Sequence, residues 1–147
     1  MTMTAVYAAG ARKFVVFNLP DFSVLPTFSP PYLNASASAV VKERLNAGTS
    51  QFNVQLAALL DAYPGSHPGA IVLPYDTLGF YTTVRSNASA YGFTNINDPC
   101  YMASNAQSMY TDFFNFPICS APDQHFFWDL VRFQKLFSAS LRACLSP

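Results

Sequence analysis

The stretch Lys13-Phe14-Val15-Val16-Phe17-Asn18-Leu19-Pro20 defines the class of fold. Its continuous apolar run, rich in β-branched and aromatic side chains, is typical of a strand buried on both faces, as in a parallel sheet. Pro20 ends the strand, and the proline-rich residues 21–32 are expected to form the loop that follows it. Open α/β sheets hold their ligands at this carboxyl end of their strands, so the loop is a natural place for a site.

The residues after this loop have the pattern of an amphipathic helix over about 36–63. Apolar side chains recur there at spacings of three, four and seven and predict one buried stripe, namely Val41, Leu45, Phe52, Leu56, Leu59 and Tyr63. Gly48-Thr49-Ser50 either divides this region into two helices or lies within one. A turn at 64–69 and a second buried strand at 70–76 complete a right-handed βαβ unit.

Less regular structure is predicted for the regions on either side of this βαβ unit. Residues 5–11 resemble the end of a helix that closes on Gly10, and 77–90 favour a short helix. Residues 91–120 lack periodicity and are expected to form a long structured loop. A closing helix is predicted from about Leu130.

Two strands make a thin sheet with two open edges. The expected fold is therefore an α/β fold with two parallel strands flanked by helices, in one incomplete domain over residues 1–147. The strand at 13–19 lacks a neighbour, which a longer chain, an oligomer or a domain-swapped form would supply.

Composition narrows the function. The chain has 147 residues, of which 51% are hydrophobic and only 11% charged, so much apolar surface needs covering. Eight basic residues balance eight acidic residues without a basic cluster. Nucleic-acid binding is not expected, because neutralising phosphates needs a local excess of Lys and Arg.

Several features of the sequence bear on the cellular compartment in which the protein is found. Cys100 and Cys119 lie in turn-like contexts that suit a loop-closing disulfide, with two buried thiols as the alternative, and Cys144 makes the count odd. The sequons at Asn34 and Asn87 are compatible with a secreted, glycosylated surface. The N-terminal residues lack the pattern of a signal peptide, and no run is long enough for a transmembrane helix. We therefore expect the chain to be part of something longer.

Three segments together resemble the GDSL or SGNH family of ester hydrolases, in particular its secreted fungal and plant-type lipases. The segments are 10–20 with Pro26; Phe52-Asn53 with Leu56, Leu59-Leu60, Pro64-Gly65 and the strand that ends at Asp76; and 91–95 with 98–100, Cys119, 122–124 and 127–129. The resemblance covers about residues 5–129 and corresponds to the C-terminal half of the family's domain. It implies a partial three-layer, flavodoxin-like α/β/α fold and an extracellular location.

The resemblance also implies a chemistry. Family members use a serine nucleophile, a histidine base and an orienting carboxylate to cleave carboxylic esters of lipids or acetylated sugars, without a cofactor. No Gly-Asp-Ser and no Gly-x-Asn-Asp, the motifs of the nucleophile and the oxyanion hole, occurs in these 147 residues. Ser23 and Ser29 lie in the wrong loop to replace the nucleophile.

The family's last motif, Asp-x-x-His, is only half preserved. Asp129 matches its carboxylate and Trp128 the preceding aromatic residue, but Arg132 stands in place of the histidine. A guanidinium has no acceptor lone pair and stays protonated, so it cannot act as a general base. Asp129 is the one catalytic residue that the resemblance assigns, and capping a final helix is an equally good role for it.

The two histidines offer no clear substitute for the base. His125 precedes Asp129 by four residues, but packing or loop hydrogen bonding is the simpler interpretation. His67 lies in a Pro/Gly turn and is expected at the surface. No residues have the spacing of metal ligands, so no metal site is predicted.

Three hypotheses about function follow. The chain is a partial ester hydrolase that is inactive alone, or a non-catalytic interaction module whose apolar surface a partner covers. The third is a truncated gene model of a longer, active esterase.

Overall fold

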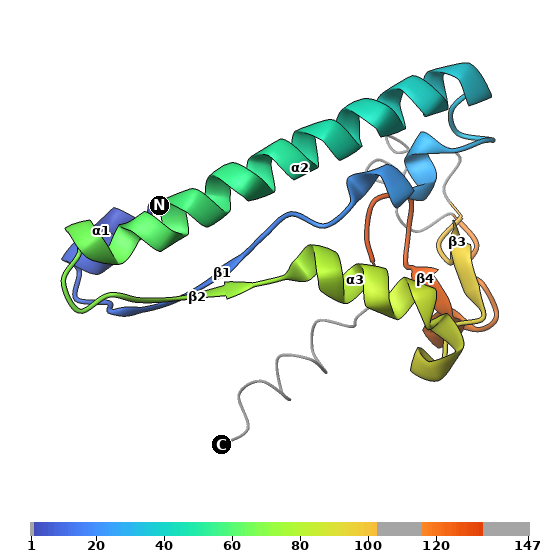
Figure 1. The fold of residues 1–147 in the computed structure, drawn as a ribbon. Coiled ribbons are helices and arrows are strands. Elements are labelled where there is room, and N and C mark those ends of the chain that lie inside the picture. Colours follow the sequence, from blue (N-terminus) through green and yellow to red (C-terminus); the bar gives the residue numbers. More distant parts are fainter. Residues whose placement is uncertain (1, 103–115, 134–147) are drawn as a thin grey trace. The chain divides into compact units, whose positions relative to one another are not determined.

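The computed structural model describes residues 2–102 and 116–133 (Figure 1). Its helices and strands are α1 (Met3–Ala8), β1 (Lys13–Phe17), α2 (Ala35–Ser66), β2 (Ile71–Tyr75), α3 (Thr77–Ser86), β3 (Asn95–Pro99) and β4 (His125–Phe127). Short 3-10 turns are η1 (Phe22–Val24), η2 (Pro26–Phe28), η3 (Ala88–Tyr91) and η4 (Pro122–Gln124). Residues 2–22 and 43–83 form one compact unit, and the other described residues form a second.

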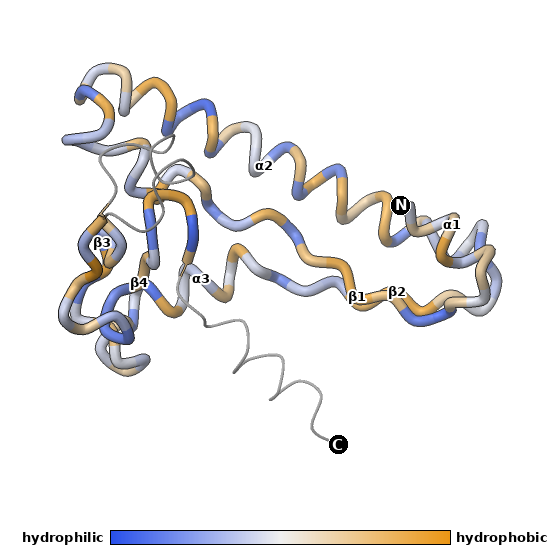
Figure 2. Tube along the Cα trace, turned by 180° about the vertical axis from the view of Figure 1, so that it is seen from behind, coloured by the Kyte–Doolittle hydropathy of each residue, from blue (hydrophilic) through white to orange (hydrophobic). Residues whose placement is uncertain are grey.

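The first unit contains the predicted strand-helix-strand arrangement. Strands β1 and β2 pair in parallel, with Val15 opposite Leu73, and α2 provides most of the connection between them. Figure 2 shows the hydrophobic character of both strands. The parallel pair with its long helix confirms the prediction of a partial α/β fold.

Helix α2 is longer and more continuous than the sequence indicated. It runs without a break through 48–50, and residues 64–66, predicted as a turn, form its last turn. A helix of 32 residues tolerates Gly48, since an interior glycine costs only about 1 kcal/mol relative to alanine. Pro64 lies in the last turn of the helix, where the hydrogen bond that it removes and the clash of its ring with the preceding turn affect only the helix end.

The buried face of α2 is narrower than the predicted stripe. Leu60 is buried, whereas Leu59 and Phe52, both assigned to the stripe, are 68% and 45% exposed. The ring of Tyr63 contacts Phe14 of β1, with centroids 5.8 Å apart. A sheet of two strands is too narrow to cover more than one row of helix side chains, which explains the difference.

The second unit contains a parallel strand pair that the sequence pattern did not predict. β3 lies in the segment 91–120, expected to be a loop, and pairs with β4, with Asn95 opposite His125. The β3 sequence Asn-Ile-Asn-Asp-Pro has low intrinsic β propensity, so pairing in the folded state determines its conformation.

The core of the second unit gathers around the end of β4. Phe126, Phe127 and Leu130 are fully buried, and Cys100 is buried beside them at the end of β3. Cys100 forms a disulfide with Cys119, and the Cys119 N–H donates to the Cys100 carbonyl at 2.8 Å. The third cysteine, Cys144, lies outside the described residues.

Two helix predictions need correction in this part of the chain. The predicted helix over 77–90 ends at Ser86 and is followed by the separate turn η3. Residues 130–133 are not helical, because Phe133 forms an antiparallel bridge with Phe127. The remainder of the predicted closing helix lies outside the described residues.

Candidate functional site

Asp129 lies just beyond the carboxyl end of the second parallel strand pair. β4 ends at Phe127, whose carbonyl accepts from the Cys100 N–H at 3.0 Å. The Trp128 carbonyl continues the pairing and accepts from the Tyr101 N–H at 2.7 Å. The carboxylate therefore lies at the kind of position where α/β folds hold functional groups.

Both oxygens of the Asp129 carboxylate have partners, although the side chain is fully buried. Oδ1 accepts from the N–H groups of Val131, at 2.9 Å, and Arg132, at 2.8 Å. Oδ2 forms an ion pair with Nε of Arg132, whose own side chain is 52% exposed. The Arg132 carbonyl also accepts from the Trp128 N–H at 2.9 Å, which closes a tight turn over residues 128–132.

This turn resolves the position of the two motif residues relative to each other. Arg132, which the sequence resemblance aligns with the family's histidine, binds the carboxylate of Asp129. Hydrogen bonds from the N–H groups two and three residues on are those of a capping aspartate. Here they close a non-helical turn, so the expected helix cap is replaced by a turn cap.

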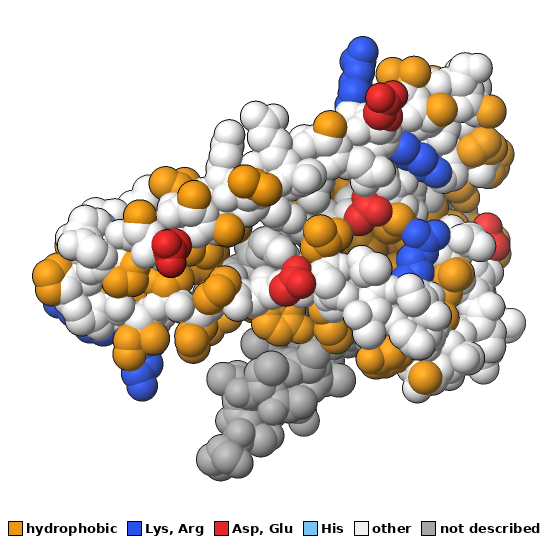
Figure 3. Space-filling view, in the orientation of Figure 1, with side chains coloured by type: hydrophobic (Ala, Val, Ile, Leu, Met, Phe, Trp, Pro, Cys, Tyr) orange, Lys and Arg blue, Asp and Glu red, His pale blue; other side chains and the backbone are white. Residues whose placement is uncertain are grey.

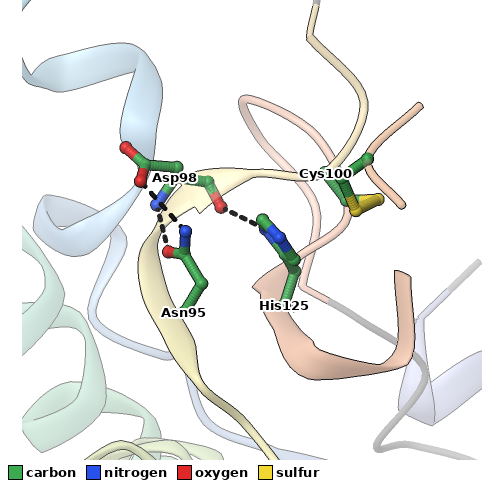
Figure 4. Close-up of a disulfide and its surroundings, with 5 residues drawn as sticks. Asn95, Asp98, Cys100 and His125 are labelled. Carbon is green, nitrogen blue, oxygen red and sulfur yellow. Dashed lines mark hydrogen bonds between the residues drawn. A yellow bond between two sulfur atoms is a disulfide. The ribbon is translucent and has the colours of Figure 1, made fainter. Parts of the chain in front are cut away.

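His125 lies at the start of β4, whereas Asp129 follows its end. The ring Nδ1 of His125 lies 3.2 Å from the Asp98 carbonyl (Figure 4). A carbonyl can only accept, so Nδ1 carries the proton and Nε2 is the acceptor of the neutral ring. His125 and Asp129 are not brought together as a base and its orienting carboxylate.

His67 differs from the exposed turn residue that the sequence suggested. It is half-buried in the first unit, with its ring stacked on Tyr63 at 3.8 Å between centroids and in edge contact with Tyr7 at 4.8 Å. α2 takes up only residues 64–66 of the predicted turn, and His67 lies just beyond the helix end, at the start of the turn over 67–69.

A polar cluster at the carboxyl ends of β1 and β2 was not singled out from the sequence. Asn18 donates to Asp76 Oδ1 at 2.8 Å, and Gly79 N–H donates to the same oxygen at 3.0 Å. The Gly79 N–H, and then the Asn18 amide, lower the pKa of Asp76 against a smaller opposing effect of burial. A Cβ at Gly79 would lie 2.2 Å from Asp76 Oδ2, so a side chain at this position would displace the Asp76 carboxylate. The cluster caps the start of α3. In the sequence it is indicated by the polar residues that directly follow the two strands, Asn18 and Asp76.

The structure also shows the surroundings of the predicted glycosylation sites and of the two serines considered as nucleophiles. The predicted glycosylation sites Asn34 and Asn87 are both exposed, and Asn34 Oδ1 accepts from the Ala37 N–H at the start of α2. Ser23 is buried, and Ser29 accepts a hydrogen bond from Lys42. Glycosylation of the two asparagines stays a prediction.

Neither a metal-binding cluster nor a membrane-spanning helix occurs among the described residues. No group of three or more His, Cys, Asp or Glu side chains among residues 2–102 and 116–133 is arranged to hold a metal ion. Within the same residues, no helix has the length and apolar character needed to cross a membrane.

Comparison with known proteins identifies relatives. A GDSL esterase/lipase of Arabidopsis thaliana is 28% identical over 127 residues, which are 86% of this chain and 34% of that protein. GDSL esterase/lipase APG of the same plant is 28% identical over 128 residues, 86% of this chain and 36% of that protein. The thermolabile hemolysin of Vibrio parahaemolyticus is 25% identical over 127 residues, 84% of this chain and 28% of that protein. No family model matches the chain.

The fold and the relatives together define the class of this protein. It is a partial α/β protein with a carboxylate at the end of a parallel strand pair. The chain is related to the GDSL esterases/lipases, which confirms the resemblance read from its sequence. It spans about a third of the length of the curated relatives that it matches.

Proposed function

We propose that this chain is the carboxylate-bearing part of a GDSL-type ester hydrolase and that it does not hydrolyse esters when assayed by itself. The observation that carries the proposal is the ion pair between Asp129 and Arg132. A guanidinium can neither remove a proton from a nucleophile nor leave the carboxylate free to orient a histidine.

The contacts of the two histidines support the same proposal. His125 donates to the Asp98 carbonyl, and His67 is engaged with Tyr63 and Ser66. Neither contact involves Asp129, and the 147 residues contain no Gly-Asp-Ser motif to supply the nucleophile. A Ser-His-carboxylate mechanism needs all three groups within hydrogen-bonding distance of one another, in that order.

The proposal extends to the whole protein that such a part would serve. Its substrate would be a carboxylic ester, of a lipid or an acetylated sugar, and the reaction would need no cofactor. An extracellular location suits the disulfide and the two exposed sequons.

Hydrolysis of p-nitrophenyl butyrate tests the proposal. We expect the purified chain to release p-nitrophenol no faster than buffer does, and a fluorophosphonate probe to leave it unlabelled. The variant Arg132→His restores Asp-x-x-His and should remain inactive, because a base without a nucleophile gives no acyl-enzyme.

An active esterase serves as the positive control, and Asp129→Ala as the matched negative control. Turnover by the unmodified chain that the fluorophosphonate abolishes would contradict the proposal. A gain of turnover in Arg132→His that is absent from Asp129→Ala would also contradict the proposal.

An exposed apolar face in the first unit favours a second candidate function, a non-catalytic interaction module that pairs with another copy of itself. Val15, Ile71 and Leu73 are 54%, 49% and 53% exposed, and Figure 3 shows hydrophobic side chains at the surface over these strands. Among the described residues β1 pairs with β2 alone. Parallel sheets are normally covered on both faces, and an open edge strand can pair with another chain. The open edge of strand 13–19 would be the contact.

Light scattering coupled to size-exclusion chromatography tests this candidate. We expect a molar mass of twice that of one chain, falling to that of one chain in Val15→Lys, because a buried ammonium group at the contact is strongly unfavourable. Val40→Lys is the matched control, since Val40 is 48% exposed on α2 and lies outside this face. A monomer at all concentrations, or a dimer that Val15→Lys leaves intact, would contradict self-association.

A further inference from the structure

A cavity in the second unit has no role in the function proposed above. It has a volume of about 350 Å³ and lies between the proline-rich loop after β1 and strands β3 and β4. Small-molecule sites typically have volumes of about 300–1,000 Å³, so the cavity is large enough for a compact ligand. Its polar lining comes from separate segments of the chain, including Tyr32, Asn97, Asp98 and His125.

Asp98 provides a carboxylate with acceptor capacity to spare. Its Oδ2 accepts from Nδ2 of Asn95 at 3.0 Å, and no described cation forms an ion pair with it. The Asn95 Oδ1 in turn accepts from the N–H groups of Asn97, at 3.1 Å, and Asp98, at 2.9 Å, which fixes the turn that presents the carboxylate. Figure 4 shows the contacts between Asn95 and Asp98. A carboxylate held in this way can accept from two ligand hydroxyls.

His125 adds a second acceptor. Because Nδ1 donates to the Asp98 carbonyl, the neutral ring presents a lone pair at Nε2. The hydrogen bond also holds the ring against β3, so this acceptor is positioned before any ligand arrives.

Two side chains supply donors. Burial, and then the negative charge of Asp98, raise the pKa of Tyr32, so its phenol stays protonated and can donate. The Asn97 Oδ1 accepts from Arg85 Nη2 at 3.4 Å, which leaves the Asn97 NH₂ group to donate. The lining therefore offers both acceptors and donors.

The charges around the cavity favour a neutral ligand. Arg85 binds the lining residue Asn97, and Lys42 Nζ donates to the lining residue Ser29 at 2.7 Å. An anion would meet the carboxylate of Asp98 in the lining, whereas a cation would be opposed by the positive charges of Arg85 and Lys42, which lie behind the lining. Pro30, Pro31 and Met102 form apolar walls against which the C–H face of a ring can pack.

We propose that this cavity is a binding site for a neutral sugar, with Asp98 and His125 accepting from vicinal hydroxyls and Tyr32 and Asn97 donating to ring or hydroxyl oxygens. Sugar hydroxyls both donate and accept, which matches this mixed lining. The site is separate from the Asp129 turn and does not depend on ester hydrolysis.

Saturation-transfer NMR with the full chain tests the site, using D-glucose, D-galactose and D-xylose one at a time, with choline chloride and sodium acetate as charged probes. We expect saturation transfer to at least one sugar and to neither charged probe. Asp98→Asn should weaken that sugar's binding about tenfold, because a charge-assisted hydrogen bond is lost. Met102→Trp, which fills the cavity from an exposed position, should abolish it.

Asp123→Asn is the matched control, because Asp123 is an exposed carboxylate of the same unit outside the cavity lining. It should bind sugar as the unchanged chain does, and circular dichroism should show that all variants are folded. Absence of transfer to every sugar, binding of a charged probe instead, or sugar binding that survives both Asp98→Asn and Met102→Trp would each overturn the proposal.

Discussion

Replacing Asp129 with alanine should lower the free energy of unfolding by about 3 kcal/mol, because it leaves buried hydrogen-bond donors without an acceptor. The carboxylate is fully buried and accepts from the N–H groups of Val131 and Arg132. These donors close the turn that follows β4, next to Leu130 and Phe127 of the core. Urea unfolding followed by circular dichroism and by the fluorescence of Trp128 measures the change.

Removing the partner of the ion pair should cost less than removing the carboxylate. Arg132→Ala takes away the Nε contact to Oδ2, but the backbone hydrogen bonds to Oδ1 remain, and the arginine side chain is 52% exposed, so water can approach Oδ2 in its place. Asp129→Asn should lie between the two, since an amide oxygen can still accept from the backbone. Asp123→Ala, at an exposed carboxylate, is the control and should change little.

The order of these variants distinguishes a structural from a catalytic role for Asp129. If Asp129→Ala were as stable as the unchanged chain, the turn-capping role would be wrong. An equal loss in Asp129→Ala and Arg132→Ala would assign the stability to the ion pair rather than to the backbone hydrogen bonds.

Removing the disulfide should have an effect of similar size. The bond joins Cys100 to Cys119 across a sequence separation of 19, and closing a loop of this length is worth about 3 kcal/mol through the unfolded state. Cys100→Ala with Cys119→Ala should therefore be less stable by about that amount. Cys100 is fully buried, so the small cavity left by alanine adds to the loss.

Both proteins should be compared in a Cys144→Ser background, which prevents mispairing through the third thiol. Dithiothreitol should bring the disulfide-bonded protein close to the stability of the double alanine variant and leave that variant unchanged. Two results would show that the bond does not stabilise the native fold. One is equal stability of the two proteins without dithiothreitol, and the other is no effect of dithiothreitol on the disulfide-bonded protein.

The first strand pair and its helix could be predicted from local pattern. The run at 13–19 and the apolar stretch at 70–76 have the composition of buried parallel strands, and the 3.6-residue period identifies the helix between them. The family resemblance was equally readable, because the order and spacing of three segments carry it. These signals are local in sequence, so one chain suffices to detect them.

The second strand pair could not be predicted in the same way. Asn95 to Pro99 is polar, and it becomes a strand because it pairs with His125 to Phe127, about thirty residues away. The exposure of Leu59 and Phe52 likewise depends on the width of the sheet beneath α2, which no helical period encodes.

The candidate site combines both kinds of information. The resemblance read from the sequence aligns Asp129 with the carboxylate of the family motif and Arg132 with its histidine. The contacts of these two residues follow from the fold: the chain turns back after β4, buries the carboxylate and pairs it with the guanidinium. The physical reason is that a buried carboxylate needs donors, and the donors that satisfy it are selected by the folded turn rather than by the motif.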